Sequence, residues 1–176
     1  MLAKYVYKKI KELLKEMPKA NYMEIGSFDG EGIAELCKSF PDSKFYSVDP
    51  FIEDGYTDHI TLKTRGEKID FIKRKFNHNT KGLKNLTHFP VESRYFMTRF
   101  KNNIPDIHIL FIDGDHAFES CRIDLNIALQ LSRKNSLIVF MDDLCKDSVK
   151  AALTMFRKEN KIKPIKINID SIYFKL

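Results

Sequence analysis

Two acidic clusters carry the clearest chemistry, because each directly follows an apolar run. Asp113-Gly114-Asp115-His116 follows the run from Ile107 to Ile112, and Asp142-Asp143 follows the run from Leu137 to Met141. Such runs predict buried strands, and neighbouring parallel strands end at the same edge of a sheet. Carboxylates gathered at one edge raise each other's pKa unless a positive group lies among them. The sequence therefore predicts an acidic pocket that holds a cation or a positively charged ligand.

A glycine-containing turn, Glu24-Ile25-Gly26-Ser27-Phe28-Asp29-Gly30, closes the first predicted strand. Glycines let a ligand approach the backbone, but the bulk and negative charge between them disfavour the pyrophosphate of NAD or FAD. Asp49-Pro50 closes the second predicted strand, Lys44 to Val48, where a carboxylate can accept the hydroxyls of a ribose. Together these features predict a nucleoside site. The alternative is that the glycines only shape a turn and Asp49 only caps the segment before Pro50.

Strand and helix patterns alternate along the whole chain, which predicts a parallel sheet with helices on both faces. We expect a doubly wound three-layer α/β sandwich, with a seven-stranded, mostly parallel sheet that ends in an antiparallel hairpin. The 176 residues predict one domain over 1–176, with an amphipathic N-terminal helix over 1–20 that packs on it. The remaining strands are expected at 21–25, 86–91, 107–112, 137–141, 162–169 and 171–176, and the remaining helices at 31–40, 65–77, 93–102, 118–131 and 147–160.

Composition limits the classes of function. The formal charge is +6, but lysines far outnumber arginines, which is typical of a solvated basic surface more than of specific phosphate recognition. Three separated cysteines form neither a disulfide framework nor a zinc site, so we expect a reducing, cytoplasmic location. No run approaches the roughly 20 apolar residues that a membrane span requires. We therefore expect no membrane insertion.

Four motifs give the chain a family resemblance: Glu24 to Gly30, Val48-Asp49-Pro50, Asp113 to Glu119 with Phe118 in the aromatic position, and Asp142-Asp143. In this combination the chain resembles the class I S-adenosylmethionine-dependent methyltransferases, specifically a small group of macrocin- and sugar-O-methyltransferase-like proteins. The resemblance covers nearly the whole chain. It implies a Rossmann-like methyltransferase fold and S-adenosyl-L-methionine as the cofactor.

The resemblance also implies roles for individual residues at the cofactor. Gly26, Ser27 and Gly30 would hold the methionine end, Asp49 and Pro50 the ribose side, and Glu92 with Ser93 the adenine edge. Asp113 and His116 would lie beside the cofactor. Glu24 would order the glycine turn and reach the cofactor amine, and the alternative is a purely structural carboxylate that accepts backbone donors.

Related O-methyltransferases bind a divalent cation with acidic residues after the fourth and fifth strands, which implies Asp113, Asp142 and Asp143 as ligands. Carboxylate oxygens suit Mg²⁺. Methyl transfer also requires deprotonation of the attacking hydroxyl, so Asp113 would serve the catalytic centre as a cation ligand, with Asp115 or His116 as the general base. The alternative is that these aspartates cap turns and helices, or lie solvated on loops, and that His116 is a helix N-terminal residue.

The acceptor implied by the resemblance is a small hydroxylated molecule such as a sugar or a natural product. The N-terminal helix, the loop from Phe51 to Thr64, or a second subunit of a homo-oligomer would cover it. The basic stretch from Lys63 to Lys84 leaves RNA or another anionic macromolecule as an alternative, although no stacking-aromatic signature of an RNA-binding module accompanies it. A third alternative is a non-catalytic domain that only binds the cofactor.

Overall fold

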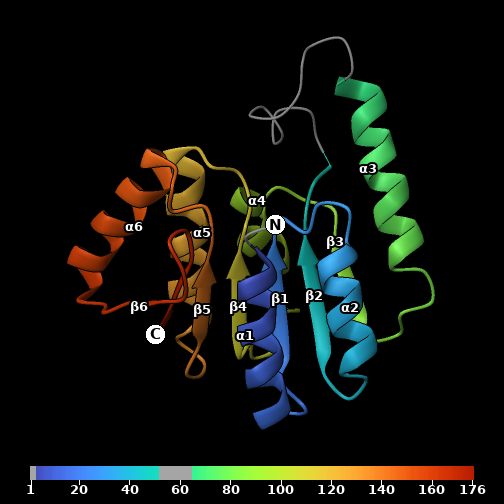
Figure 1. Cartoon of the computed structure of the whole chain (residues 1–176), viewed down its shortest axis with the longest axis horizontal. Coiled ribbons are helices and arrows are strands. Elements are labelled where there is room, and N and C mark those ends of the chain that lie inside the picture. Colours follow the sequence, from blue (N-terminus) through green and yellow to red (C-terminus); the bar gives the residue numbers. More distant parts are fainter. Residues whose placement is uncertain (1–2, 52–64) are drawn as a thin grey trace.

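The computed structural model of the chain describes residues 3–51 and 65–176, and within them the protein is a three-layer α/β sandwich (Figure 1). The strands are β1 (Asn21–Ile25), β2 (Lys44–Val48), β3 (Leu86–Phe89), β4 (Ile109–Ile112), β5 (Ile138–Met141), β6 (Ile165–Lys166) and β7 (Ile172–Lys175). The helices are α1 (Ala3–Glu16), α2 (Glu31–Ser39), α3 (Arg65–Asn79), α4 (Ser93–Phe100), α5 (Phe118–Leu131) and α6 (Asp147–Asn160).

The strands of the described residues form one sheet in the order β3-β2-β1-β4-β5-β7-β6. The first five of these strands are mutually parallel, whereas β7 pairs antiparallel with both β5 and β6. The predicted doubly wound fold with its terminal antiparallel hairpin is therefore confirmed. The chain order reverses between β1 and β4, so the fold has its topological switch point there, where open α/β sheets place ligands.

Each face of the sheet has its own hydrophobic core because successive side chains of a strand point to opposite sides. Tyr22 of β1 packs with Val6, Ile10 and Leu14 of α1, whereas the next residue, Met23, packs with the helices of the other face. Figure 1 shows α1 and α2 in front of the central strands and α4 behind them. Two fully covered faces explain why the central strands β4 and β5 are entirely apolar.

The predicted elements differ from the observed ones mainly at their ends. The fourth strand begins at Ile109, not Ile107, and the third ends at Phe89, not Val91. The amphipathic N-terminal helix, predicted over 1–20, ends at Glu16. The carboxyl ends of β1, β2, β4 and β5 fall where the sequence predicts them. Those ends determine the position of the site.

The register brings these strand ends into line. Ile25 pairs with Val48 on one side and with Ile112 on the other, and Ile112 pairs with Met141. The next residue of each strand is therefore held at one edge, as the amide of Gly26 donates to the carbonyl of Val48 at 2.9 Å. The amides of Asp113 and Asp142 likewise donate to Ile25 and Ile112, at 2.9 and 3.3 Å. The predicted convergence of the acidic clusters is confirmed.

Candidate functional site at the carboxyl edge of the sheet

The turns after β1 and β4 touch through Gly26. Its φ of 87° is in the left-handed region, and a Cβ atom placed on it would lie 2.1 Å from the carbonyl oxygen of Asp113. A side chain has no space there, so the two turns come together only because residue 26 is a glycine. Gly30, with a φ of 73°, begins α2 after the same turn and packs against the ring of Phe76. The glycines bring the backbones of two loops and a helix start to one place.

Glu24 lies beneath the glycine turn and is 1% exposed. Its Oε2 accepts a hydrogen bond from the hydroxyl of Tyr7 on α1 at 3.0 Å and another from the hydroxyl of Tyr22. Burial raises the pKa of Glu24 to about 7, and the two tyrosine hydroxyls and Ser27 oppose that rise. The carboxyl group therefore titrates near neutral pH. No pattern in the sequence predicted the contact between Tyr7 and Glu24.

Asp49 connects the turn after β1 to the loop after β2. The carboxylate is 2% exposed, and its two oxygens accept from the amides of Phe28 at 2.9 Å and Phe51 at 3.0 Å. Both phenylalanines have left-handed backbones, with φ of 49° and 50°, which is uncommon for a non-glycine residue. Asp49 thus holds two strained loop positions. Its predicted contact with ribose hydroxyls stays a prediction, and Ser27 lies beside it, buried, with its hydroxyl bonded to Ser47 at 2.8 Å.

Asp113, His116 and Asp143 form the acidic centre, since each offers a ligand atom within 4.8 Å of the other two. Burial, then the charges of Asp142 and Asp143, raises the pKa of Asp113 well above its ordinary value. The hydrogen bond from His116 instead lowers the pKa of Asp143, and Nε2 of His116 lies 2.7 Å from Oδ2 of that residue. Two carboxylates of unequal proton affinity therefore face one imidazole.

Lys146 defines the tautomer of His116. Its ammonium group lies 2.8 Å from Nδ1, and an ammonium can only donate. Nδ1 must then accept, so in the neutral imidazole the proton is on Nε2, which donates to Asp143. A protonated imidazole would place its Nδ1 hydrogen against the ammonium. The contact with Lys146 therefore favours a neutral His116.

Asp115 and Asp142 contact other partners. Asp115 accepts from the hydroxyl of Ser120 at 2.7 Å and from the amide of Ala117 at 3.3 Å, so both oxygens serve the start of α5. Asp142 is 6% exposed and accepts from the buried hydroxyl of Ser171 at 2.8 Å. Of the three predicted cation ligands, the structure brings together Asp113 and Asp143, with His116 as the third member of the group.

Glu92 and Ser93, predicted at the adenine edge, lie at the start of α4. Glu92 precedes the helix and forms an ion pair with Arg94 at 2.6 Å. Beside Ser93 lies Asp124 of α5, which is 1% exposed and whose Oδ1 has no hydrogen-bond partner among the described residues. Burial raises the pKa of Asp124 to about 7. Sequence reasoning missed it, although its spacing from the buried Cys121 places it on the inner face of α5.

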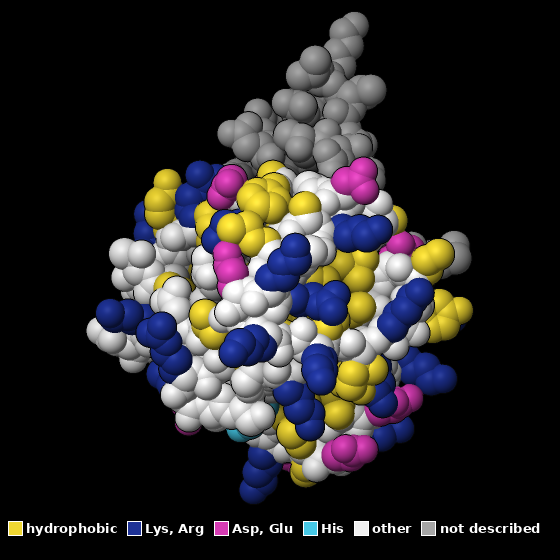
Figure 2. All heavy atoms as spheres, turned by 90° about the vertical axis from the view of Figure 1, so that its left-hand side faces the viewer, with side chains coloured by type: hydrophobic (Ala, Val, Ile, Leu, Met, Phe, Trp, Pro, Cys, Tyr) yellow, Lys and Arg dark blue, Asp and Glu magenta, His cyan; other side chains and the backbone are white. Residues whose placement is uncertain are grey.

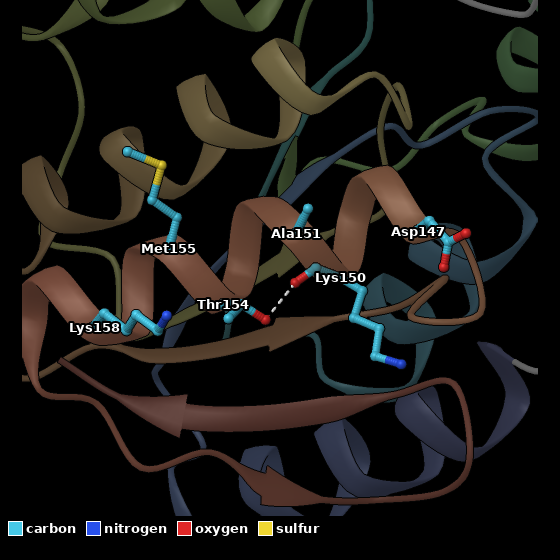
Figure 3. Close-up of a pocket in the computed structure, with 6 residues that line it drawn as sticks. All are labelled: Asp147, Lys150, Ala151, Thr154, Met155 and Lys158. Carbon is cyan, nitrogen blue, oxygen red and sulfur yellow. Dashed lines mark hydrogen bonds between the residues drawn. The ribbon is translucent and has the colours of Figure 1, made fainter.

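The face formed by α6 and the C-terminal hairpin is strongly basic (Figure 2). Its exposed basic side chains are Lys150, Arg157, Lys158, Lys161, Lys163 and Lys166. Figure 3 shows a hollow on this face, lined by residues of α6 alone, from Asp147 to Lys158. None of the predicted site residues lines it. The hollow is therefore a feature of the outer surface of α6, distinct from the acidic centre.

Comparison with known proteins agrees with this geometry. Residues 23–144 match the model of a family described as a methyltransferase domain. The match includes the glycine turn, Asp49 and the acidic centre and spans more than half of the chain. The chain therefore belongs to this methyltransferase-domain family. The helices of the described residues include none long and apolar enough to cross a membrane.

A curated relative is an uncharacterized protein, R132, from Acanthamoeba polyphaga mimivirus, 25% identical over 122 residues. The match covers 69% of this chain and 50% of the relative, so the chain spans about half the length of that protein.

Solved structures share the fold at low identity. A protein from Staphylococcus aureus that carries the provisional name caffeoyl-CoA O-methyltransferase matches with a TM-score of 0.67 and 14% identity, over 97% of this chain and 83% of that one. CalS11, a TDP-rhamnose 3'-O-methyltransferase of calicheamicin biosynthesis, matches with a TM-score of 0.66 and 12% identity, over 99% of this chain and 79% of that one.

Proposed function

We propose that the protein is an S-adenosylmethionine-dependent O-methyltransferase that acts, with a divalent cation, on a small polyhydroxylated acceptor such as a sugar or a natural product. The observation that carries the proposal is that the glycine turn and the acidic centre meet at the carboxyl edge of the sheet. The glycine turn at Gly26 touches the backbone of Asp113, and Asp113 belongs to the acidic centre. A nucleoside cofactor and a hydroxylated acceptor would thus meet at the switch point of the sheet.

The cofactor would lie along the strand ends from β1 to β4. Gly26, Ser27 and Gly30 would receive the methionine end, with the buried Glu24 beneath them. Asp49 and Pro50 would face the ribose. Asp49 is suited to this role because it is a buried carboxylate at the end of β2, held between the turn after β1 and the loop after β2. When bound, S-adenosylmethionine would supply a methyl group on a positively charged sulfur.

The adenine edge would lie at the start of α4, where Glu92 and Ser93 stand. Asp113 and His116 would line the cofactor on the side of the acceptor. Burial first, and then the charges of Asp142, Asp143 and Glu24, raises the pKa of Asp113 at this edge. A positively charged sulfonium or a cation would relieve that repulsion.

The acidic centre also fits a divalent cation. Asp113 and Asp143 offer hard carboxylate oxygens, which suit Mg²⁺ or Mn²⁺, and His116 offers a nitrogen within the same 4.8 Å. A bound cation would lower the pKa of an acceptor hydroxyl. The predicted role of Asp142 as a ligand requires its second oxygen to face the centre while the first accepts from Ser171. His116 and Asp142 are thus the two candidates for the third ligand.

For the proton of the attacking hydroxyl, His116 is a better base than Asp115. Asp115 uses both oxygens to hold the start of α5. Nδ1 of His116 already bears a lone pair, which the ammonium of Lys146 covers at 2.8 Å. A shift of Lys146 toward the acceptor would uncover this lone pair, and Nδ1 of His116 could then accept the proton.

Calorimetry with S-adenosylhomocysteine, followed by methyl-transfer assays on sugars and catechols with and without Mg²⁺ or Mn²⁺, tests the proposal. We expect binding of the nucleoside and metal-stimulated transfer. Binding without transfer to any acceptor would support the non-catalytic alternative. Absence of binding would refute the cofactor assignment. Metal titrations of His116→Ala and Asp142→Asn identify the third ligand as the residue whose loss weakens the cation.

A second candidate is methylation of RNA or another anionic macromolecule. Two exposed aromatic rings favour it, since each has cations beside it. Lys75 lies 5.4 Å from the ring centre of Phe71 on α3, and Tyr95 on α4 has Arg94 and Arg99 at 5.8 and 5.5 Å. Cationic side chains next to exposed rings can stack with bases. Binding of single-stranded RNA that weakens steeply with salt would support this candidate over the small acceptor.

A further inference from the structure

The N-terminal helix reaches the cofactor edge through one side chain. Tyr7 of α1 crosses over α2 at Gly32, where a Cβ atom would lie 2.2 Å from the ring. The ring then packs edge-on against Phe111 of β4, with centroids 5.6 Å apart. Its hydroxyl donates to Glu24 of β1 at 3.0 Å. One residue of α1 thus contacts α2, β4 and β1 immediately beneath the glycine turn.

We propose that Tyr7 is a positioning residue for the cofactor, and that its hydroxyl keeps the Glu24 carboxylate charged beneath the glycine turn, where the charge attracts the amino group of the bound cofactor. The N-terminal helix is then a working part of the binding site. This inference rests on the proposed function. It adds to that function the residue that controls how strongly the amino-acid end is held.

Glu24 is poised between two charge states. Burial favours the neutral acid, whereas the hydroxyls of Tyr7 and Tyr22 donate to Oε2 and favour the carboxylate. With a pKa of about 7 the two states are equally populated near neutral pH. The hydroxyl donors therefore determine whether Glu24 is charged, because the described residues place no lysine or arginine in an ion pair with it.

The other titratable groups around Glu24 act in the opposite direction or weakly. Asp49 of the β2 loop raises the pKa of Glu24 by its charge, and Ser27 lowers it by a hydrogen bond. Glu24 in turn raises the pKa of Asp113 after β4 and of Cys37 on α2. Ser27 therefore acts in the same direction as the two phenols, whereas the charge of Asp49 acts against them.

The two phenols are matched probes from different elements. Tyr7→Phe removes the hydroxyl and keeps the ring over Gly32, so the packing of α1 is retained. Tyr22→Phe removes the second donor to the same oxygen from within β1 and leaves Tyr7 of α1 in place. Tyr5, on the same helix as Tyr7 but 58% exposed, supplies the control variant Tyr5→Phe.

The test compares two ligands by calorimetry from pH 6 to pH 9. S-adenosylhomocysteine has the amino-acid group, whereas 5'-methylthioadenosine keeps the adenosine and the thioether without it. Loss of one hydrogen bond to a carboxylate is enough to raise the pKa of Glu24 from about 7 to about 8. At pH 7 the ionised fraction then falls from about one half to about one tenth, which weakens S-adenosylhomocysteine about fivefold.

We expect Tyr7→Phe and Tyr22→Phe to show this loss at pH 7 and to regain affinity as the pH rises, while 5'-methylthioadenosine is unaffected. Tyr5→Phe should behave as the wild type, and Glu24→Gln should remove the pH difference between the two ligands. Thermal unfolding of each variant verifies that the fold is retained.

Three results would overturn the inference while leaving the proposed function intact. The first is that Tyr7→Phe binds S-adenosylhomocysteine with wild-type affinity at every pH. The second is that the variant binds both ligands equally more weakly. The third is that Tyr22→Phe does not show the pH-dependent loss of affinity that Tyr7→Phe shows. Failure of the wild type to bind either ligand would overturn the proposed function, and the inference with it.

Discussion

Replacement of Gly26 by alanine is the sharpest test of the site, because the structure supplies a matched control. A Cβ at residue 26 would lie 2.1 Å from the carbonyl oxygen and 2.6 Å from the carbonyl carbon of Asp113. Both are backbone atoms, so relief requires one of the two strand-end turns to move. Gly82 also has a left-handed backbone, with a φ of 80°, but no atom lies within 4 Å of its added Cβ.

Gly26→Ala and Gly82→Ala both place an alanine in a left-handed backbone, but only the Cβ at residue 26 would clash with other backbone atoms. A left-handed L-residue costs about 1–2 kcal/mol, and alanine recovers part of this by restricting the unfolded chain, so Gly82→Ala should cost about 1 kcal/mol. Gly26→Ala adds the displacement of two packed turns, and we expect a total loss of about 3 kcal/mol or more. The free energy of unfolding is measured by urea denaturation of both variants.

Cofactor binding provides the second measurement. Movement of the turn after β1 away from Asp113 would separate the nucleoside side of the site from the acidic centre. Gly26→Ala should therefore lose affinity for S-adenosylhomocysteine at least tenfold, a change of about 1.4 kcal/mol, while Gly82→Ala binds as the wild type. Equal unfolding losses for the two variants, or unchanged binding by Gly26→Ala, would refute the close approach of the two turns as the basis of the site.

Three further outcomes are expected. Asp49→Ala should weaken the binding of S-adenosylhomocysteine by about 1–3 kcal/mol in calorimetry, because the ribose hydroxyls and the amides of Phe28 and Phe51 lose their acceptor. Tight binding by this variant would contradict the ribose assignment. Asp143→Asn should abolish metal-stimulated transfer with cofactor affinity retained, and retained stimulation would remove Asp143 from the cation site. Asp124 has its pKa raised to about 7, so the native state binds more protons than the unfolded chain between about pH 4 and 7, and stability falls as pH rises through that window. Asp124→Asn should lack this fall and gain about 3 kcal/mol relative to the wild type between pH 5 and pH 8 in urea denaturation, and a parallel pH dependence of the two proteins would refute it.

Local patterns in the sequence were sufficient for the architecture. Apolar runs with abrupt acidic ends predicted β4 and β5, and the alternation with helices predicted the parallel sheet. The beginning of the fourth strand was less well predicted, because Ile107 is buried although β4 begins only at Ile109. Burial depends on the whole fold, whereas membership of a strand depends on pairing with a neighbour.

The direction of each side chain within the site could not be read from the sequence. Asp142 and Asp143 are adjacent and chemically identical, yet one turns to Ser171 and the other to His116. The alternation of side chains in a strand continues past its end, and a φ of 59° at Asp143 redirects the chain there. The family resemblance implied both residues as ligands, because it matches positions along the chain and carries no information on side-chain direction.

The sequence by itself determined which residue types stand at the ends of which strands, because apolar periodicity and glycine positions act locally. Only the tertiary structure decided which of them meet and which charge they carry. Tyr7 and Glu24 are 17 residues apart, and Lys146 and His116 are 30 residues apart. Their contacts arise from the packing of α1 and from the placement of the loop after β5. Proton affinity depends on those long-range neighbours and on burial, and neither is encoded in any short segment of the chain.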